Sequence, residues 1–123
     1  MKRIIKFRVW NGEQMVSPDY IDRNGVAHWK ENSIPQISDE LMQFTGLKDK
    51  NKARIYEGDI ITYRWEDRKG DEVVNHVIKW DNGRFLICPI RSTAQTWNIH
   101  LYPYNEESEV IGNIYENPEL IKP

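Results

Sequence analysis

Two carboxylate side chains lie close together in the middle of the chain, at Glu57 and Asp59, with Gly58 between them. A carboxylate pair can perform general acid–base chemistry when one member holds a proton and the other does not. On a strand, residues two apart point to the same side. A glycine between them instead indicates a tight turn, which the aspartate closes by accepting backbone N–H groups. We therefore assign Glu57, Gly58 and Asp59 to a structural turn and predict no catalytic residue there.

The histidines and the single cysteine show neither a metal-binding nor a catalytic pattern. His28, His76 and His100 lack the short spacing that is typical of metal ligands, so we predict no metal and no cofactor. Cys88 follows an apolar segment and has no base nearby in the sequence, which predicts a buried and unreactive thiol. We find no glycine-rich phosphate loop and no hydrolase motif, and we expect a protein that is not an enzyme.

Basic residues gather in two places, where contact with a partner is the chemistry to consider. One cluster contains Lys48, Lys50, Lys52 and Arg54; the other contains Lys6 and Arg8, with Trp10 on the same face of its strand. Cations beside exposed rings suit the phosphates and bases of nucleic acid. Lysines on loops and edge strands also keep β-proteins soluble and unpaired, so both interpretations stay open.

The composition indicates one compact globular domain. The chain has 123 residues, 39% hydrophobic and 29% charged, and is rich in rings, with five Trp, six Tyr and three Phe. The net charge of −2 and pI of about 5.9 argue against a dedicated nucleic-acid binder. No signal peptide or apolar membrane span is visible, and a single cysteine fits a reducing cytoplasm.

Alternation and turn residues predict short strands in the first part of the chain. We expect a strand over residues 4–10, a turn at Asn11-Gly12 and a small hairpin over residues 20–27. Residues 29–36 are polar and contain Pro35, so we expect a loop there. Residues 41–44 fit either a short helix capped by Ser38 or a strand, and their alternation favours the strand.

The second part of the chain, from residue 60 onward, shows a regular series of strand patterns. We expect them over residues 60–65, 72–80, 85–88, 97–101 and 110–115, with the clearest hairpin turn at Asp81-Asn82-Gly83. Short strands separated by turn signals at this spacing are typical of a small barrel or sandwich.

Four blocks of sequence together resemble the YopX-like family of phage and prophage proteins. They are Ile5–Trp10, Met42–Lys50, Ile55–Ile60 and Val110–Leu120. The chain departs from the family at Asn51-Lys52, where Asn-Gly is frequent. The resemblance implies a mainly β fold (β-rich α+β at most), with a small SH3-like, partly open barrel over residues 41–123 after an N-terminal β-hairpin lobe over 1–40. It also implies a phage origin in a bacterium and no known activity.

We therefore expect a cytoplasmic, non-enzymatic protein that binds another protein or itself and makes no contact with a membrane. The rings exceed what a small barrel needs for its core, so some tryptophans should lie on a contact surface; the candidates are Trp10, Trp29, Trp65, Trp80 and Trp97. The alternative is a nucleic-acid-binding accessory protein that uses the two basic clusters.

Overall fold

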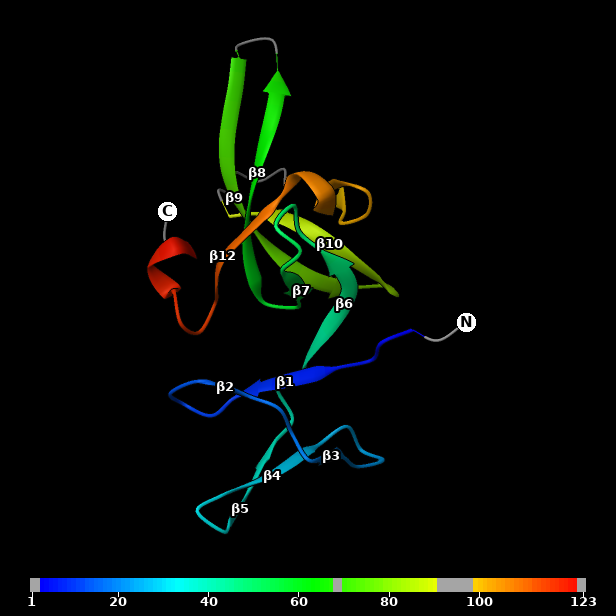
Figure 1. Cartoon of the computed structure of the whole chain (residues 1–123), viewed down its shortest axis with the longest axis vertical. Coiled ribbons are helices and arrows are strands. Elements are labelled where there is room, and N and C mark those ends of the chain that lie inside the picture. The colour runs from blue at the N-terminus through cyan, green and yellow to red at the C-terminus, as the bar shows by residue number, and fades with distance from the viewer. Residues whose placement is uncertain (1–2, 68–69, 91–98, 122–123) are drawn as a thin grey trace. The chain divides into compact units, whose positions relative to one another are not determined.

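A computed structural model describes residues 3–67, 70–90 and 99–121, without the side chains of 64–67 and 70–74. It divides into two compact units, residues 1–44 and 45–123. Each unit is described by itself, and strand β6 (Met42–Lys48) contributes residues to both (Figure 1).

The N-terminal unit is built from short antiparallel strands. Strand β1 (Phe7–Trp10) pairs with β2 (Met15–Val16) and with the start of β6. A three-stranded sheet follows in the order β3 (Tyr20–Ile21), β4 (Ala27–Glu31) and β5 (Ile34–Ser38). The core of the unit contains Val9, Ala27 and Trp29, with Val16 and Leu41 packed against them.

The loop expected over residues 29–36 is wrong, because β4 and β5 form a hairpin there. Asn32 and Ser33 connect the two strands with φ of 51° and 65°, the left-handed pair that a two-residue hairpin turn requires. Pro35 is compatible with the hairpin because β5 is an edge strand, where a missing N–H breaks no ladder. The strand expected at residues 41–44 is confirmed as β6 and continues through Gly46, whose φ is 84°.

The C-terminal unit holds a five-stranded antiparallel sheet in the order β11-β10-β9-β8-β12. Its strands are β8 (Asp59–Asp67), β9 (Gly70–Asp81), β10 (Arg84–Pro89), β11 (Ile99–His100) and β12 (Glu109–Asn113). Strand β7 (Arg54–Tyr56) pairs with the end of β6. Two 3-10 turns, η1 (Tyr104–Glu107) and η2 (Pro118–Ile121), flank β12 in the sequence.

The mainly β prediction is confirmed, and the five-stranded sheet curls around an aliphatic core (Figure 1). That core is formed by Ile55, Ile61, Ile78, Ile87 and Leu101. The hairpin turn predicted at residues 81–83 is also confirmed, since Asn82 and Gly83 connect β9 and β10 with φ of 49° and 82°. Trp97, expected in the next strand, lies outside the described residues, and that strand is Ile99–His100.

Candidate functional site

The lysine cluster at residues 48–54 lies on the hairpin between β6 and β7. The Lys52 N–H donates to the Asp49 carbonyl at 3.0 Å, and the Asp49 N–H donates to the Ala53 carbonyl at 2.8 Å. Lys52 itself has φ of 68°, which is the left-handed position that glycine normally fills in such a hairpin. The lysine therefore occupies a backbone conformation that does not favour its side chain.

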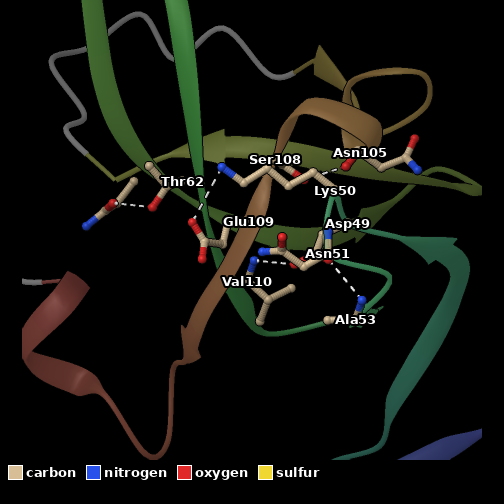
Figure 2. A network of polar contacts seen from close by, with 10 residues as sticks. Asp49, Lys50, Asn51, Ala53, Thr62, Asn105, Ser108, Glu109 and Val110 are labelled. Atoms are coloured by element: carbon tan, nitrogen blue, oxygen red, sulfur yellow. Dashed lines mark hydrogen bonds and ion pairs between the residues drawn. The ribbon is translucent and has the colours of Figure 1, made fainter.

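Asp49 organises this hairpin with its carboxylate. The Oδ1 atom accepts the backbone N–H groups of Asn51 at 2.8 Å and Ala53 at 2.9 Å. The Oδ2 atom accepts the N–H of Val110, from β12, at 2.9 Å. Figure 2 shows the carboxylate between its three donors. Asp49 is buried, and three N–H donors are the partners that a buried carboxylate needs.

A second connection ties the same hairpin to η1. The side-chain amide of Asn105 donates through Nδ2 to the Lys48 carbonyl at 2.8 Å, and the Lys50 N–H donates to the Ser108 carbonyl at 3.0 Å. The Ser108 hydroxyl in turn donates to the Asn105 carbonyl at 2.9 Å. Asn105 is only 5% exposed, and its Oδ1 atom has no hydrogen-bond partner within the described residues.

A pocket of about 490 Å³ lies between the hairpin and η1. Its lining consists of the end of β6, the hairpin and the two middle residues of η1: Gly46, Leu47, Lys48, Asp49, Lys50, Lys52, Asn105 and Glu106. Three of the four lysine and arginine residues predicted as a contact cluster therefore line one pocket, whereas Arg54 lies outside its lining. The surface formed by Lys48, Lys50 and Lys52 is therefore concave.

The lysines of the pocket differ in their pairing. The Lys50 ammonium lies 3.6 Å from the Glu109 carboxylate, and Figure 2 shows its side chain reaching toward that residue. Within the described ranges, Lys48 and Lys52 have no ion-pair partner and are exposed. Two cations without an ion-pair partner among the described residues therefore line the same pocket.

The second predicted cluster lies in the N-terminal unit. Lys6 is exposed, and Arg8 and Trp10 are half-buried in or beside β1. Because the two clusters belong to different units, they are treated as separate surfaces.

The N-terminal sheet presents a row of two rings and an isoleucine on its outer face. The strand register places Tyr20 opposite His28 and His28 opposite Ile37, so these three side chains share one face. The Tyr20 ring stacks on His28 with centroids 4.5 Å apart, yet Tyr20 is 59% exposed and Ile37 67% exposed. The opposite face buries Ala27 and Trp29. Sequence reasoning missed this row because it assigned Ile37's strand to a loop.

Strand β5 is an edge of the same sheet, and no described strand pairs with its outer side. The carbonyl of His28 accepts the Asp19 N–H at 2.8 Å, so the backbone groups of His28 point toward β3 and away from β5. In an antiparallel ladder its opposite residue, Ile37, then also points away from the pairing, as does Pro35. The Ile37 N–H and the Pro35 carbonyl therefore face outward.

The tryptophans divide between core and surface. Trp29 is 7% exposed and donates its indole N–H to the Glu31 carboxylate at 3.0 Å. Trp80 is 51% exposed and packs against Phe85 beside the β9–β10 turn. Trp10 is half-buried. Trp97 and the side chain of Trp65 lie outside the described residues.

Asp59, Cys88 and His76, which were considered for chemistry, are hydrogen-bonded or buried within the fold. The Asp59 carboxylate accepts the Tyr56 N–H at 2.7 Å across the Glu57-Gly58 turn, where Gly58 has φ of 80°. Cys88 is buried, and burial raises the pKa of its thiol. His76 is fully buried against the Tyr63 ring.

Two kinds of feature are absent from the described ranges. These ranges contain no group of three histidine, cysteine or acidic residues placed to hold a metal ion. They also contain no helix that is long and apolar enough to cross a membrane.

Comparison with known proteins relates nearly the whole chain to one family. The sequence profile of the YopX protein family matches residues 6–122. The chain is 25% identical to the SPbeta prophage-derived uncharacterized protein YopX of Bacillus subtilis (strain 168), over 94% of the chain and 95% of that protein.

Two solved structures have the same fold. One is protein EF1440 from Enterococcus faecalis, with a TM-score of 0.60 and 29% identity, over 98% of this chain and all of that one. The other is the crystal structure of YopX from Bacillus subtilis, with a TM-score of 0.56 and 25% identity, over 96% of both chains.

Proposed function

The chain belongs to the YopX protein family, and we propose that it is a non-enzymatic module that binds protein, in the first instance a second copy of itself. The observation that carries the proposal is the row of Tyr20, His28 and Ile37 beside the β5 edge, in which Tyr20 and Ile37 are exposed and His28 is half-buried. Exposed apolar side chains next to unpaired backbone groups are the features that strand-to-strand association uses.

The edge is complementary to itself. When two copies of β5 align antiparallel about Ile37, each Ile37 N–H faces the other copy's Ile37 carbonyl. The same alignment places the Pro35 carbonyl opposite Asp39, so the proline supplies an acceptor and its missing N–H breaks no bond of the native sheet. The self-complementary pairing is therefore compatible with proline in an edge strand.

The side chains support the same arrangement. Pairing about Ile37 joins the two outer rows, so that Tyr20, His28 and Ile37 of one copy continue into Ile37, His28 and Tyr20 of the other. An isologous contact of this kind closes as a dimer and leaves no further edge of the same type. Burial of Ile37 at the centre provides the apolar contribution.

The test is the mass of the full chain in solution, measured by light scattering over a range of concentrations. Ile37→Pro removes an outward N–H while sparing the β4–β5 ladder, so we expect a folded monomer with an unchanged circular dichroism spectrum. Ile34→Lys is the matched control, because Ile34 is 61% exposed on the same strand but its backbone faces β4. A wild-type chain that stays monomeric at hundreds of micromolar would refute the proposal.

A cytoplasmic site of action fits a chain whose single cysteine is unpaired. Fractionation of a bacterium that expresses the full chain tests this location, and recovery outside the cytoplasmic fraction would oppose it.

A second candidate function is favoured by the pocket that Lys48, Lys50 and Lys52 line, named the lysine pocket. A cleft in which Lys48 and Lys52 form no ion pair with any residue that the structure describes supports binding of nucleic acid through its backbone phosphates. Such binding weakens as salt is raised, and changing Lys48, Lys50 and Lys52 to Glu should abolish it. Absence of any electrophoretic shift with single- or double-stranded DNA and RNA at low salt would eliminate this candidate.

A further inference from the structure

We propose that an ion pair between Lys30 of one copy and Asp39 of the other sets the register of the β5 pairing and makes it selective for a second copy of this chain. The inference rests on the self-association proposed above, and it adds the residues that determine the specificity of that contact. Because an antiparallel pair of identical edges has two-fold symmetry, the ion pair forms twice, once at each end of the paired edges.

Lys30 and Asp39 belong to the face of the N-terminal sheet that carries His28 and Ile37. Lys30 is two residues beyond His28 in β4 and lies opposite Pro35, and residues two apart in a strand point to the same face. Asp39 directly follows β5, two residues beyond Ile37, so the same alternation places it on that face. Both residues are exposed, and neither forms an ion pair with any residue that the structure describes.

The pairing about Ile37 brings these two charges within reach of each other. It places Asp39 of the second copy opposite Pro35, so that Lys30, Pro35 and Asp39 form one row across three neighbouring strands. The outer members of such a row are roughly 9.5 Å apart, which is twice the spacing of neighbouring strands. An extended lysine side chain covers most of this distance, because it can lie along the short proline ring and keep its ammonium group in water.

The ion pair also distinguishes this register from the adjacent one that keeps outward backbone groups facing each other. That register shifts one copy by two residues and places Ile37 opposite Pro35 of the other copy. The Ile37 carbonyl then faces a proline nitrogen that has no hydrogen to donate. The row that starts at Lys30 then continues into the apolar Ile37 side chain instead of Asp39. Pairing about Ile37 avoids both losses.

The ion pair acts mainly on the choice of partner. Exposed ion pairs add little to affinity in water, whereas like charges that meet at an interface strongly disfavour the wrong partner. A strand of another protein without an acid at this position gains the backbone bonds of the β5 edge and lacks the ion pair. The charges therefore restrict a backbone contact, which has little sequence preference of its own, to a second copy of the chain.

Charge reversal in the full-length chain tests the inference, with light scattering or sedimentation over a range of concentrations as the measurement. Lys30→Glu alone and Asp39→Lys alone should each raise the dissociation constant by about tenfold or more, because each homodimer then contains two like-charge pairs. An equimolar mixture of the two variants should associate as the wild type does, since both contacts of the mixed dimer join an acid to a base. The double variant, with both changes in one chain, should also associate.

Lys6→Glu and Glu13→Lys are the matched controls. Both residues are exposed in the N-terminal unit and lie outside the β3–β4–β5 sheet, and the changes alter the net charge by the same amounts. They should change the dissociation constant by less than about twofold, because salt screens charges that are distant from the contact. Circular dichroism of each variant shows whether the fold is kept.

The outcomes separate this inference from the proposed function. If the wild type dimerises and the single reversals behave like their controls, the inference is overturned and the self-association stands. A loss of association that neither the mixture nor the double variant recovers also overturns it, since the loss then has a cause other than the pairing of charges. A wild-type chain that stays monomeric at hundreds of micromolar refutes the self-association and, with it, this inference.

Discussion

The carboxylate of Asp49 accepts the backbone N–H of Val110 at 2.9 Å, across 61 residues of sequence. With its two local bonds, this contact makes one buried side chain the link between the β6–β7 hairpin and strand β12. The walls of the lysine pocket therefore depend on an acidic residue that forms no ion pair with any described residue.

Replacing Asp49 with Asn should destabilise the protein by about 2–4 kcal/mol, because an amide presents N–H donors to backbone N–H donors and loses the charge of the acceptor. Urea denaturation followed by fluorescence measures the loss. Asp19→Asn, an exposed acid in the other unit, serves as control and should change the stability by less than about 0.5 kcal/mol. Equal stability of the two variants would contradict the role given to Asp49.

Replacing Lys52 with Gly should stabilise the protein by about 0.5–1 kcal/mol. The gain arises because glycine adopts the φ of 68° without strain, partly offset by the greater freedom of glycine in the unfolded chain. The midpoint of urea denaturation should rise for Lys52→Gly and not for Lys52→Ala, which keeps a Cβ atom. A rise in both variants would mean that the lysine charge, and not the backbone conformation, limits stability.

Replacing Gly112 with Ala should destabilise the protein by about 1–3 kcal/mol, since the new Cβ atom would overlap the Asn117 side chain. Asn117 Oδ1 accepts the Asn113 N–H at 3.1 Å, so it is held in place. A double-mutant cycle with Asn117→Ala checks the cause by thermal unfolding. The Gly112→Ala change should cost much less once the Asn117 side chain is gone, and additive losses would exclude this overlap.

The stability of the N-terminal unit should fall at acid pH. The hydrogen bond with His28 lowers the pKa of Asp22 below 3.8, and the hydrogen bond from the Trp29 indole lowers the pKa of Glu31 below 4.5. The folded state therefore binds fewer protons, and the stabilisation is present above these ordinary values and is lost as the pH falls through the lowered ones. The Trp29 indole N–H signal in NMR spectra reports the change, and Glu31→Gln should flatten its pH dependence.

Much of the fold follows from local sequence, and the exceptions have physical causes. Asn82-Gly83 specifies its hairpin because both residues tolerate positive φ. Pro35 indicated a loop, and it lies in a strand because β5 is at an edge, which depends on the order of strands in space. A local pattern contains no information about that order.

The candidate sites were harder to predict than the fold. Asp49 lies between two lysines in the sequence, and its partner Val110 comes from far along the chain, so no local pattern indicates its role. Asn105 is buried, although the neighbouring residues in the sequence are polar and do not indicate burial. The lysines of the pocket could be named from composition, but the concave wall opposite them is formed by η1. Burial of Trp29 and exposure of Trp80 likewise depend on long-range packing.

The separation between Asp49 and Val110 also has a consequence for protein synthesis. The hairpin strands β3, β4 and β5 pair within residues 20–38, so a nascent chain can form them early. The β6–β7 hairpin receives its last N–H donor only after β12 has left the ribosome. The open β5 edge is therefore expected to be available while the rest of the chain is still being translated, and neighbouring ribosomes on one messenger RNA would bring two such edges together.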